Sequence, residues 1–529
     1  MSAPQDPRSP DRSAFRAIAG DWKPSWSTLV WFVVALVASV PAWIVKHPPL
    51  QDMPFHYATL RVIHDFSDPT YAFRNFYTLD LLHTQYVLYY LVGHVLAFVL
   101  GVKIANVAMI CLYLAGTPIA LRFLLRALGR DERLAMLVIP LLVNPMFMLG
   151  LLPFVFGIPV MFVALTAAIR WIDEPTPARG VILGVLAIAT FYAHVLPFAL
   201  FGLGFIGVFP WTRPKRWIRA GLPVVPSLIV VVLWLTTSDA GKGSLGGLGG
   251  GKQVPLALEA ALPGFFTWSV NVFRDSSDEL FFVLACVTVL VLVALAASER
   301  PTEATTDPNG APAVGPGLRA YVILPLACLA LYFTTGENLG EVWLFSQRFP
   351  VPFLMSLVPL VPMPREAHRR SVATAVMAVV ACASTMNTAR HFVEFETKEV
   401  GDIDEAIATI PKGQRVVGLI YDKFSTVVPH APFLHYVSRY QAEKGGMVLF
   451  SYAHFKHWPF HYLPGKVPPP GHVRERWEWM PEAVPIEELA GAYDFVLTRG
   501  PGFHPPPGTF HPTFRGARWT VWEKDGPGR

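Results

Sequence analysis

The chain has 529 residues, of which 53% are hydrophobic and only 15% are charged, and its mean hydropathy is +0.41. Soluble globular chains carry about 25% charged residues, so this composition excludes an ordinary soluble protein and indicates a polytopic membrane protein. The net charge is only +5, the basic residues fall in short clusters between apolar runs, and no basic stripe indicates a nucleic-acid partner.

Residues 1–27 are polar and basic, too long for the charged region of a signal peptide, and no small-residue cleavage site follows them. They predict a cytoplasmic tail before a retained first helix. A spanning helix needs about 20 apolar residues. Eleven spans are predicted: 28–45, 85–102, 104–121, 134–149, 154–171, 180–201, 221–237, 280–297, 319–335, 349–363 and 371–386.

The positive-inside rule tests this count, because basic loops gather on the cytoplasmic side of a membrane. With the N-terminus inside, the clusters Arg213–Arg219 and Arg365–Arg370 fall inside as expected. The cluster RFLLRALGRDER, from Arg122 to Arg133, falls on the far side and is the one exception. The far side also receives the external loops 46–84 and 238–279 and the segment 387–529.

The segment 387–529 is polar and rich in proline. RVVGLIYD and YDFVLTRG read as short buried strands, IDEAIATIP as a helix, and RWTVWEKD as a last alternating strand. The predicted fold is therefore an all-α polytopic membrane domain over residues 28–386, followed by a small C-terminal α/β domain that is extracytoplasmic.

The stretch HPPLQDMPFHYATL places Asp52 and His56 just beyond the first predicted span. If a helix begins here, the two residues share one of its faces. Burial at the membrane surface would raise the pKa of the carboxyl group toward the range of a general base. The alternative is that Asp52 only caps a helix that has Pro54 in its first turn.

Histidines elsewhere allow two readings. His194 lies inside a predicted span, where an ionisable group is either functional or a packed neutral ring bonded to a carbonyl group. His454, His457 and His461 have the spacing of one helical face and could hold zinc. Pro459 interrupts such a helix, however, and the aromatic neighbours favour a packed surface, so no metal site is predicted.

Four features occur in a fixed order: a first helix that leads directly to Asp52, the stretch His83–Gly101, the stretch Arg122–Val138, and LFSQRFPVPFLMSLVPLVP over Leu344–Pro362. Together they resemble the GT-C superfamily of membrane glycosyltransferases, which take sugars from polyprenyl-phosphate donors. The resemblance covers roughly the first 390 residues by layout and the C-terminal domain in outline.

The resemblance implies roles for particular residues. Asp52 would be the external-loop acid that deprotonates the acceptor, and Arg348 would hold the lipid phosphate, because a guanidinium pairs with two phosphate oxygens at once. Alternatively, Arg348 snorkels to the interface or pairs with Glu341. Many relatives carry paired acids, whereas QDMPFH has one, which leaves the detailed chemistry and metal dependence open. Asp80 is the predicted second carboxylate, with His83 and Asp65 as alternatives.

The predicted catalytic set is thus Asp52, His56 and Asp80, and the predicted substrate-binding set is Arg348, Glu341 and His83. No cofactor is predicted beyond the donor, and a divalent metal is unsupported. The predicted partners are a lipid-linked sugar donor, membrane lipids and a lipid, glycan or protein acceptor, in the inner membrane of a cell.

Two other functions compete with sugar transfer: a transporter or flippase of a lipid-linked precursor, and a catalytically inert relative within an envelope assembly system. A transporter should show broken helices at matching places in its two halves. Asn144–Pro159 is interrupted by Gly and Pro, but the second half has no matching stretch.

Overall fold

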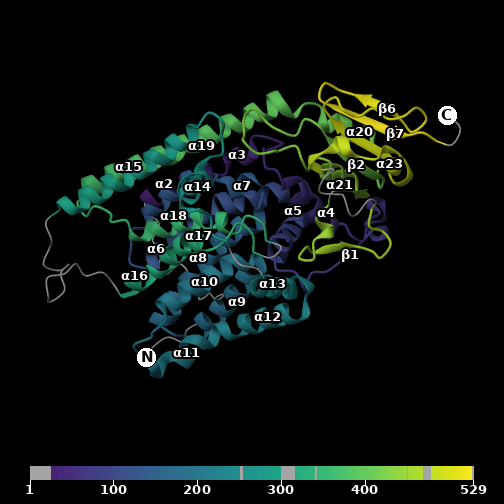
Figure 1. Ribbon diagram of the computed structural model, residues 1–529. Helices are drawn as coiled ribbons and strands as arrows, with labels where there is room; N and C mark the ends of the chain where they lie inside the picture. Colours follow the sequence, from purple (N-terminus) through teal and green to yellow (C-terminus); the bar gives the residue numbers. More distant parts are fainter. Residues whose placement is uncertain are drawn as a thin grey trace, which may run out of the picture.

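The computed structural model describes residues 26–250, 254–299, 316–339, 342–449, 451–468 and 478–526. Helices make up most of these residues, and a small sheet lies near the C-terminus (Figure 1). The prediction of a helical membrane protein with a small C-terminal sheet region is therefore confirmed. The predicted tail 1–27 lies almost wholly outside the described residues.

The elements up to residue 224 are α2 (Trp26–Val37), α3 (Val40–Trp43), α4 (Met53–His64), η1 (Pro69–Tyr71), η2 (Phe73–Asn75), β1 (Tyr77–Leu79), α5 (Val87–Leu114), α6 (Gly116–Ala127), η3 (Glu132–Leu141), α7 (Pro145–Met148), α8 (Leu152–Asp173), α9 (Pro177–Ala193), α10 (Val195–Val208), η4 (Pro214–Arg216), α11 (Trp217–Gly221) and η5 (Leu222–Val224). Further along the chain lie α12 (Val225–Thr237), α13 (Asp239–Gly250), α14 (Leu258–Val270), α15 (Ser277–Ser298), α16 (Pro316–Tyr321), α17 (Ile323–Thr334), η7 (Ser346–Arg348), α18 (Pro350–Leu357), η8 (Val358–Leu360), α19 (Ala367–Phe395) and η9 (Glu396–Val400).

Among the described residues, five helical stretches are long and apolar enough to cross a membrane: Val87–Ala127, Leu152–Asp173, Pro214–Thr237, Ser277–Ser298 and Ala367–Val400. Four shorter apolar helices accompany them: Thr28–Val37, Pro177–Ala193, Val195–Val208 and Ile323–Thr334. The exact number of spans and their orientation stay predictions.

Several predicted spans are not single helices, and three of them show how the breaks arise. The span 134–149 consists of η3 and α7, because Pro140 and Pro145 prevent a continuous helix. The span 180–201 is broken between α9 and α10 at His194, whose backbone is extended. The span 349–363 is the short α18 followed by η8, in a stretch that contains several prolines.

Helix α5 is interrupted at Gly101, which has φ 73° and ψ 156°. The two sides of the break lie against each other, since a Cβ on Gly93 would be 3.4 Å from Cγ of Met109. Tyr90, before the break, hydrogen bonds His56 of α4, and Ala97 packs in one cluster with residues of α4. The first part of α5 therefore lies along α4 at one end of the molecule and does not cross to the other end.

The basic helix ends consequently gather at one end of the molecule. Arg126, at the end of α6, is close enough to Arg170 of α8 for electrostatic repulsion. Arg179 donates to the Arg170 carbonyl at 3.2 Å, and Arg219 donates to the Pro175 carbonyl at 2.7 Å. The sequence placed the Arg122–Arg133 cluster on the side opposite Arg213–Arg219, whereas the structure brings residues of both clusters to one end of the molecule. The membrane side of each cluster stays a prediction.

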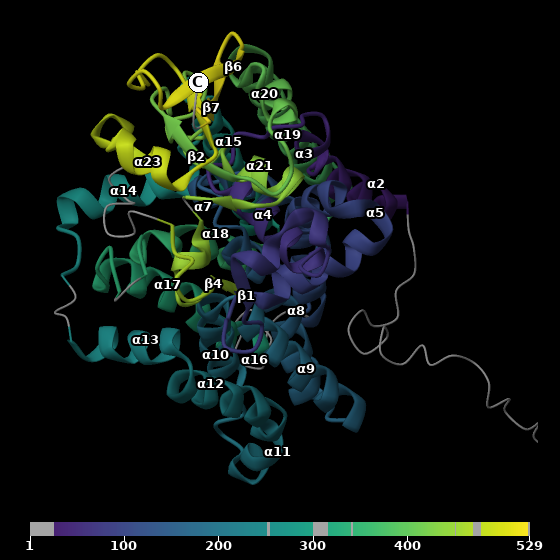
Figure 2. The same cartoon turned by 90° about the vertical axis from the view of Figure 1, so that its right-hand side faces the viewer.

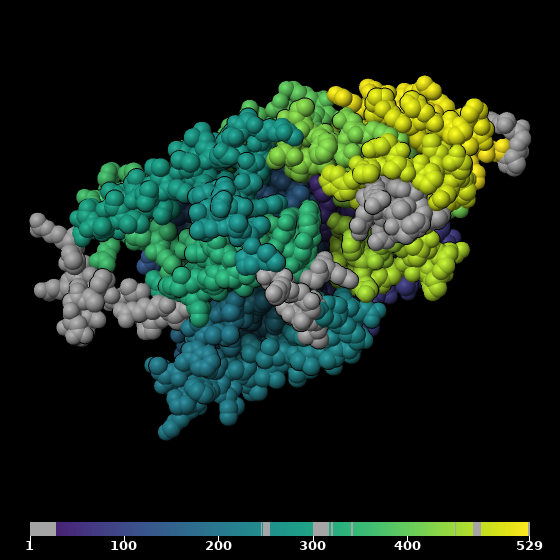
Figure 3. Space-filling view, in the orientation of Figure 1, coloured from purple at the N-terminus to yellow at the C-terminus, as the bar shows by residue number. Residues whose placement is uncertain are grey.

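The C-terminal segment (residues 401–526) follows the long helix α19 and η9. It contains α20 (Ile403–Thr409), β2 (Arg415–Ile420), α21 (Ser438–Lys444), β3 (Met447–Val448), η10 (Tyr452–His454), β4 (Phe460–Tyr462), η11 (Pro481–Ala483), α23 (Ile486–Ala492), β5 (Phe495–Arg499), β6 (Phe510–Arg515) and β7 (Trp519–Lys524). Five of the strands form a sheet in the order β3-β2-β5-β7-β6, in which β2 pairs in parallel with β3 and β5. The sheet lies at the end of the molecule away from α6, α11 and α16 (Figures 1 and 3).

The C-terminal segment packs on the loop that joins the first two helical regions. Strand β1 of that loop pairs antiparallel with β4, and α4 lies beside α21 (Figure 2). Arg61 Nε donates to the Ala442 carbonyl, and Gln441 Nε2 to the Tyr77 hydroxyl, both at 2.7 Å. This docking brings residues from both ends of the sequence to the start of α4.

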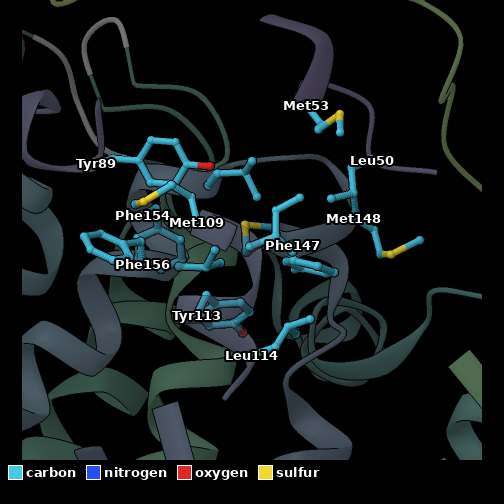
Figure 4. Packing of buried hydrophobic residues seen from close by; sticks show 14 of the residues in the cluster. Leu50, Met53, Tyr89, Met109, Tyr113, Leu114, Phe147, Met148, Phe154 and Phe156 are labelled. Atoms are coloured by element: carbon cyan, nitrogen blue, oxygen red, sulfur yellow. The ribbon is translucent and has the colours of Figure 1, made fainter. Parts of the chain in front are cut away.

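The start of α4 rests on a rigid apolar core. Leu50 and Met53 pack over Phe147 and Met148 of α7, with Tyr113 beneath them (Figure 4). The Tyr113 hydroxyl donates to the Leu142 carbonyl at 2.8 Å, which fixes the backbone that leads into α7. The core thus holds in place both the residues before α4 and the turn between α7 and α8.

Candidate functional site

A cavity of about 160 Å³ lies where the start of α4, the α7–α8 turn, the α9–α10 break, η7 and the C-terminal segment meet. We name it the Asp52 cavity. Its lining residues are Asp52, His56, Tyr86, Leu151, Pro153, Phe154, His194, Val342, Trp343, Arg348, Tyr452, Phe455, His457 and Trp458. Three of the six predicted site residues, Asp52, His56 and Arg348, therefore line one cavity.

Backbone contacts with the α7–α8 turn position Asp52. The N–H groups of Gln51 and Asp52 donate to the carbonyls of Met148 and Leu149, at 3.0 and 3.2 Å. Gly150 has a φ of +82°, and a Cβ there would lie 2.7 Å from the Asp52 nitrogen. Asp52 is the N-cap residue of α4, yet its side chain makes no capping hydrogen bond. The carboxylate is thus turned away from the role of a simple helix cap.

Asp52 is buried, with 6% of the residue exposed, and its side chain meets the C-terminal segment. Tyr452 donates its hydroxyl hydrogen to Oδ2, and Nε2 of His435 lies 3.1 Å from Oδ1. The other ring nitrogen of His435 contacts the carboxylate of Glu478. Burial opposes protonation of His435, but the carboxylates of Glu478 and Asp52 outweigh it and raise its pKa to about 9.

His56 already has partners for both ring nitrogens. Nε2 donates to the Gly150 carbonyl and Nδ1 accepts from the Tyr90 hydroxyl, each at 2.7 Å. This pattern requires a neutral ring, and burial lowers the pKa of His56 to about 4. His56 therefore fixes α4 against the α7–α8 turn. Although His56 lines the cavity, both of its ring nitrogens are already occupied by protein partners.

Arg348 is buried, with 8% exposure, and lies on η7 at the entry to α18. Its Nη2 donates to the Trp343 carbonyl at 3.0 Å, and its guanidinium lies over the ring of Phe154. Its Nε has no hydrogen-bond partner, and no carboxylate among the described residues lies within ion-pair distance of it. A buried cation in this setting is suited to an anionic ligand.

His194 faces Arg348 across the cavity wall. Its Nδ1 accepts from the Leu196 N–H at 3.0 Å, which caps α10, and its Nε2 lies 3.2 Å from Nη1 of Arg348. Both neighbours can only donate, whereas a neutral imidazole has one acceptor nitrogen. Two donor hydrogens therefore face each other on this wall of the cavity.

Asp80 and His83 lie together in a second cavity of about 290 Å³, which we name the Asp80 cavity. His83 Nδ1 is 2.9 Å from Oδ1 of Asp80. His454 and His461 line this cavity, whereas His457 lines the Asp52 cavity, so the three histidines do not form one face. Glu341 lies outside the described residues. Among the described residues, no three His, Cys, Asp or Glu side chains are placed to hold a metal ion.

Sequence reasoning missed the three partners of Asp52. Tyr452 lay in the histidine-rich stretch SYAHFKHWPFHYLPG but was not singled out, Glu478 lay in a stretch without a recognised motif, and His435 had no distinctive spacing. The second carboxylate near Asp52 is Glu478, reached through His435, rather than Asp80. The only available signal was the unusual number of aromatic and histidine residues around SYAHFKHWPFHYLPG, which indicates a packed surface but not its partner.

Comparison with known proteins establishes a similarity of fold. No protein-family model and no curated protein matches the chain. The crystal structure of ArnT from Cupriavidus metallidurans in the apo state matches with a TM-score of 0.54 at 12% sequence identity, over 94% of this chain and 99% of that chain. At this coverage the match includes most of the C-terminal segment. The chain therefore shares its overall fold with this ArnT structure, in agreement with the layout that the sequence resembles.

Proposed function

We propose that this protein is a membrane glycosyltransferase that moves a sugar from a polyprenyl-phosphate donor to an acceptor on the extracytoplasmic side of the inner membrane. One observation carries the proposal: the Asp52 cavity holds a buried carboxylate and a buried guanidinium that has no carboxylate partner among the described residues. Sugar transfer from a phosphate needs a base for the acceptor and a cation for the leaving group.

Asp52 is the base in this reaction. Each of its carboxylate oxygens has one protein contact among the described residues, so lone pairs remain for a substrate hydrogen. An acceptor hydroxyl or amine loses its proton to Asp52 as its oxygen or nitrogen bonds to the anomeric carbon. The bond between that carbon and the phosphate oxygen breaks, and polyprenyl phosphate leaves.

Arg348 and His194 receive the phosphate. An oxyanion that contacts both Nη1 of Arg348 and Nε2 of His194 accepts a hydrogen bond from each of them. The two donor hydrogens then have an acceptor and no longer point only at each other. The unpaired Nε of Arg348 offers a further hydrogen bond. These groups stabilise negative charge where it develops on the leaving group.

Aromatic side chains form much of the remaining wall. Tyr86, Phe154 and Trp458 line the cavity, and Trp458 is held by a 2.9 Å hydrogen bond from Nε1 to Thr59. Such rings pack against the apolar faces of sugars and of prenyl chains and exclude water, which would otherwise compete as the acceptor.

The proposed orientation follows from charge. The basic ends of α6, α8, α9 and α11 lie together, and basic ends face the cytoplasm. The Asp52 cavity and the C-terminal segment lie at the other end, toward the extracytoplasmic side, where lipid-linked donors meet their acceptors.

The test is transfer of radiolabelled sugar from a panel of polyprenyl-phosphate donors by membranes that contain equal amounts of wild type or variant protein. Asp52→Asn should lower transfer about 10²–10⁴-fold, the usual contribution of a general base. Arg348→Gln should lower it about 10²–10³-fold through lost charge stabilisation.

Matched controls make the same chemical changes at two positions of the loop 46–84, away from the cavity. Asp68→Asn keeps a residue that can cap η1, and Arg74→Gln alters an exposed side chain, so both should transfer sugar at the wild-type rate. If no donor supports transfer, or if Asp52→Asn is as active as wild type, the proposal is wrong and transport or an inert scaffold takes its place.

A further inference from the structure

All three groups that surround the Asp52 carboxylate belong to the C-terminal segment. Tyr452 donates to one carboxylate oxygen, His435 lies 3.1 Å from the other, and Glu478 contacts the far side of the His435 ring. The loop that carries Asp52 supplies no hydrogen bond to its side chain among the described residues. The immediate environment of the carboxylate therefore depends on the docked C-terminal segment.

We propose that His435 is a positioning residue that orients the Asp52 carboxylate and supplies its positive partner, that Glu478 holds His435, and that docking of the C-terminal segment completes the site. This inference rests on the proposed function, because Asp52 is the base there. It adds residues to that function which neither the sequence pattern nor the fold match assigns.

We call the contacts that join Asp52, His435 and Glu478 the tie. Burial explains why this tie is needed. A carboxylate at 6% exposure loses its hydration and is destabilised as an anion unless a cation or donor replaces the water. An imidazolium between two carboxylates places a positive charge beside both of them. One imidazolium and two carboxylates leave a net negative charge on the group of three.

Orientation is the second effect. Phe55 stacks near His435 at a centroid distance of 4.1 Å and near Tyr452 at 4.3 Å, so both partners of Asp52 are packed against α4 itself. Held from two sides, the carboxylate has few rotamers available. A base that is fixed before the substrate binds reacts without reorganisation.

The titratable groups that face His435 come from three places. They are Asp52 and, at greater distance, His56 at the start of α4, Tyr452 on η10, and Glu478 ahead of η11. The proposal therefore predicts that the protonation of His435 depends on both carboxylates and not on either alone.

The first experiment reads His435 directly and needs no substrate. Full-length protein with ¹³C-labelled histidine rings, in lipid nanodiscs, is titrated by NMR, and His435→Gln identifies the signal. The midpoint should lie near pH 9 in wild type and fall by at least one pH unit in Glu478→Gln and in Asp52→Asn. A wild-type midpoint at or below 6.5, or no change in either variant, overturns the tie.

The second experiment separates positioning from mere structural support. In His435→Gln the acid limb of the pH profile of kcat/KM should shift to higher pH by at least one pH unit. The reason is that Asp52 then loses the imidazolium of His435 and lies near the carboxylate of Glu478 without a cation between them. Tyr452→Phe should lower kcat with a smaller displacement, because it removes a hydrogen bond and no charge. If His435→Gln lowers kcat/KM but leaves the acid limb of its pH profile at the wild-type pH, the positioning role is overturned.

The two experiments also keep the inference apart from the proposed function. If wild type transfers no sugar but His435 titrates high and responds to Glu478→Gln, the tie stands and the transferase proposal fails. If wild type transfers sugar and His435 titrates as an ordinary histidine, the proposed function stands and the tie fails.

Discussion

Gly150 decides where Asp52 lies, although it contributes no side chain. Its φ of +82° favours glycine, and its Cα faces the Asp52 backbone at a distance that leaves no room for a methyl group. Its carbonyl also accepts from His56. One residue in the α7–α8 turn thereby sets the positions of two cavity residues.

Gly150→Ala should accordingly displace Asp52 and lower sugar transfer at least tenfold, and it should destabilise the protein by about 1–3 kcal/mol through backbone strain. Gly116→Ala is the matched control, since a Cβ there meets nothing within 4 Å and Gly116 begins α6. Transfer rates and thermal unfolding in detergent measure both. Equal behaviour of the two variants would show that the close approach is unimportant.

At the residue scale, the sequence identified Asp52 and Arg348 because each follows a recognisable motif at a helix end. It could not identify Tyr452 as a partner of Asp52, because the two are 400 positions apart and nothing local links them. The role of His56 was also hidden, since its two hydrogen-bond partners lie on α5 and in the α7–α8 turn.

At the scale of elements, apolar runs located most helices but not their breaks. The run 180–201 reads as one span, yet His194 ends α9 and caps α10 with its own ring. Hydropathy averages over such a break, because the flanking residues remain apolar. The break places the His194 ring beside Arg348, a contact that hydropathy does not reveal.

The two contacts of His194 can be separated by substitution. His194→Asn should retain the cap of α10 but lose the contact with Arg348, whereas His194→Ala should lose both. We expect His194→Ala to be less stable than His194→Asn by about 1 kcal/mol, the usual value of an N-cap, while both variants transfer sugar slowly. Thermal unfolding and transfer assays check this, and wild-type transfer by His194→Asn would rule out a role in phosphate binding.

At the scale of the whole molecule, the C-terminal sheet region was recognisable from its alternating strands, but its docking was not. Strand pairing between β1 and β4 joins residues from opposite ends of the chain. The packing of the first part of α5 was hidden for a related reason: this stretch is apolar enough to cross a membrane, and nothing in its sequence shows that it lies along α4.

This arrangement predicts a testable topology. In a protein whose four native cysteines are replaced by alanine, Arg130→Cys and Arg216→Cys should be labelled from the same side of the membrane, and Asp68→Cys from the other. A thiol reagent that cannot cross membranes, applied to intact and opened cells, makes the measurement. Labelling of Arg130→Cys and Arg216→Cys from opposite sides would contradict the gathered basic ends.

Stability should depend on pH through His435. Its pKa in the folded protein, about 9, lies above the ordinary value of 6.5, so its contribution is complete below pH 6.5 and is lost as the pH rises through about 9. The Tm of wild type should therefore fall across this window more steeply than that of His435→Gln. Parallel curves for the two proteins would show that His435 contributes nothing to the pH dependence.

The distance along the chain between Asp52 and its partners bears on how the protein is made. Residues 52 and 452 emerge from the ribosome 400 residues apart, so the membrane helices are synthesised and inserted while the Asp52 carboxylate still lacks Tyr452, His435 and Glu478. A polypeptide that stops after α19 carries every helix of the membrane part and none of these groups. Synthesis itself thus delays the assembly of the site until the last fifth of the chain has been translated and folded back onto α4.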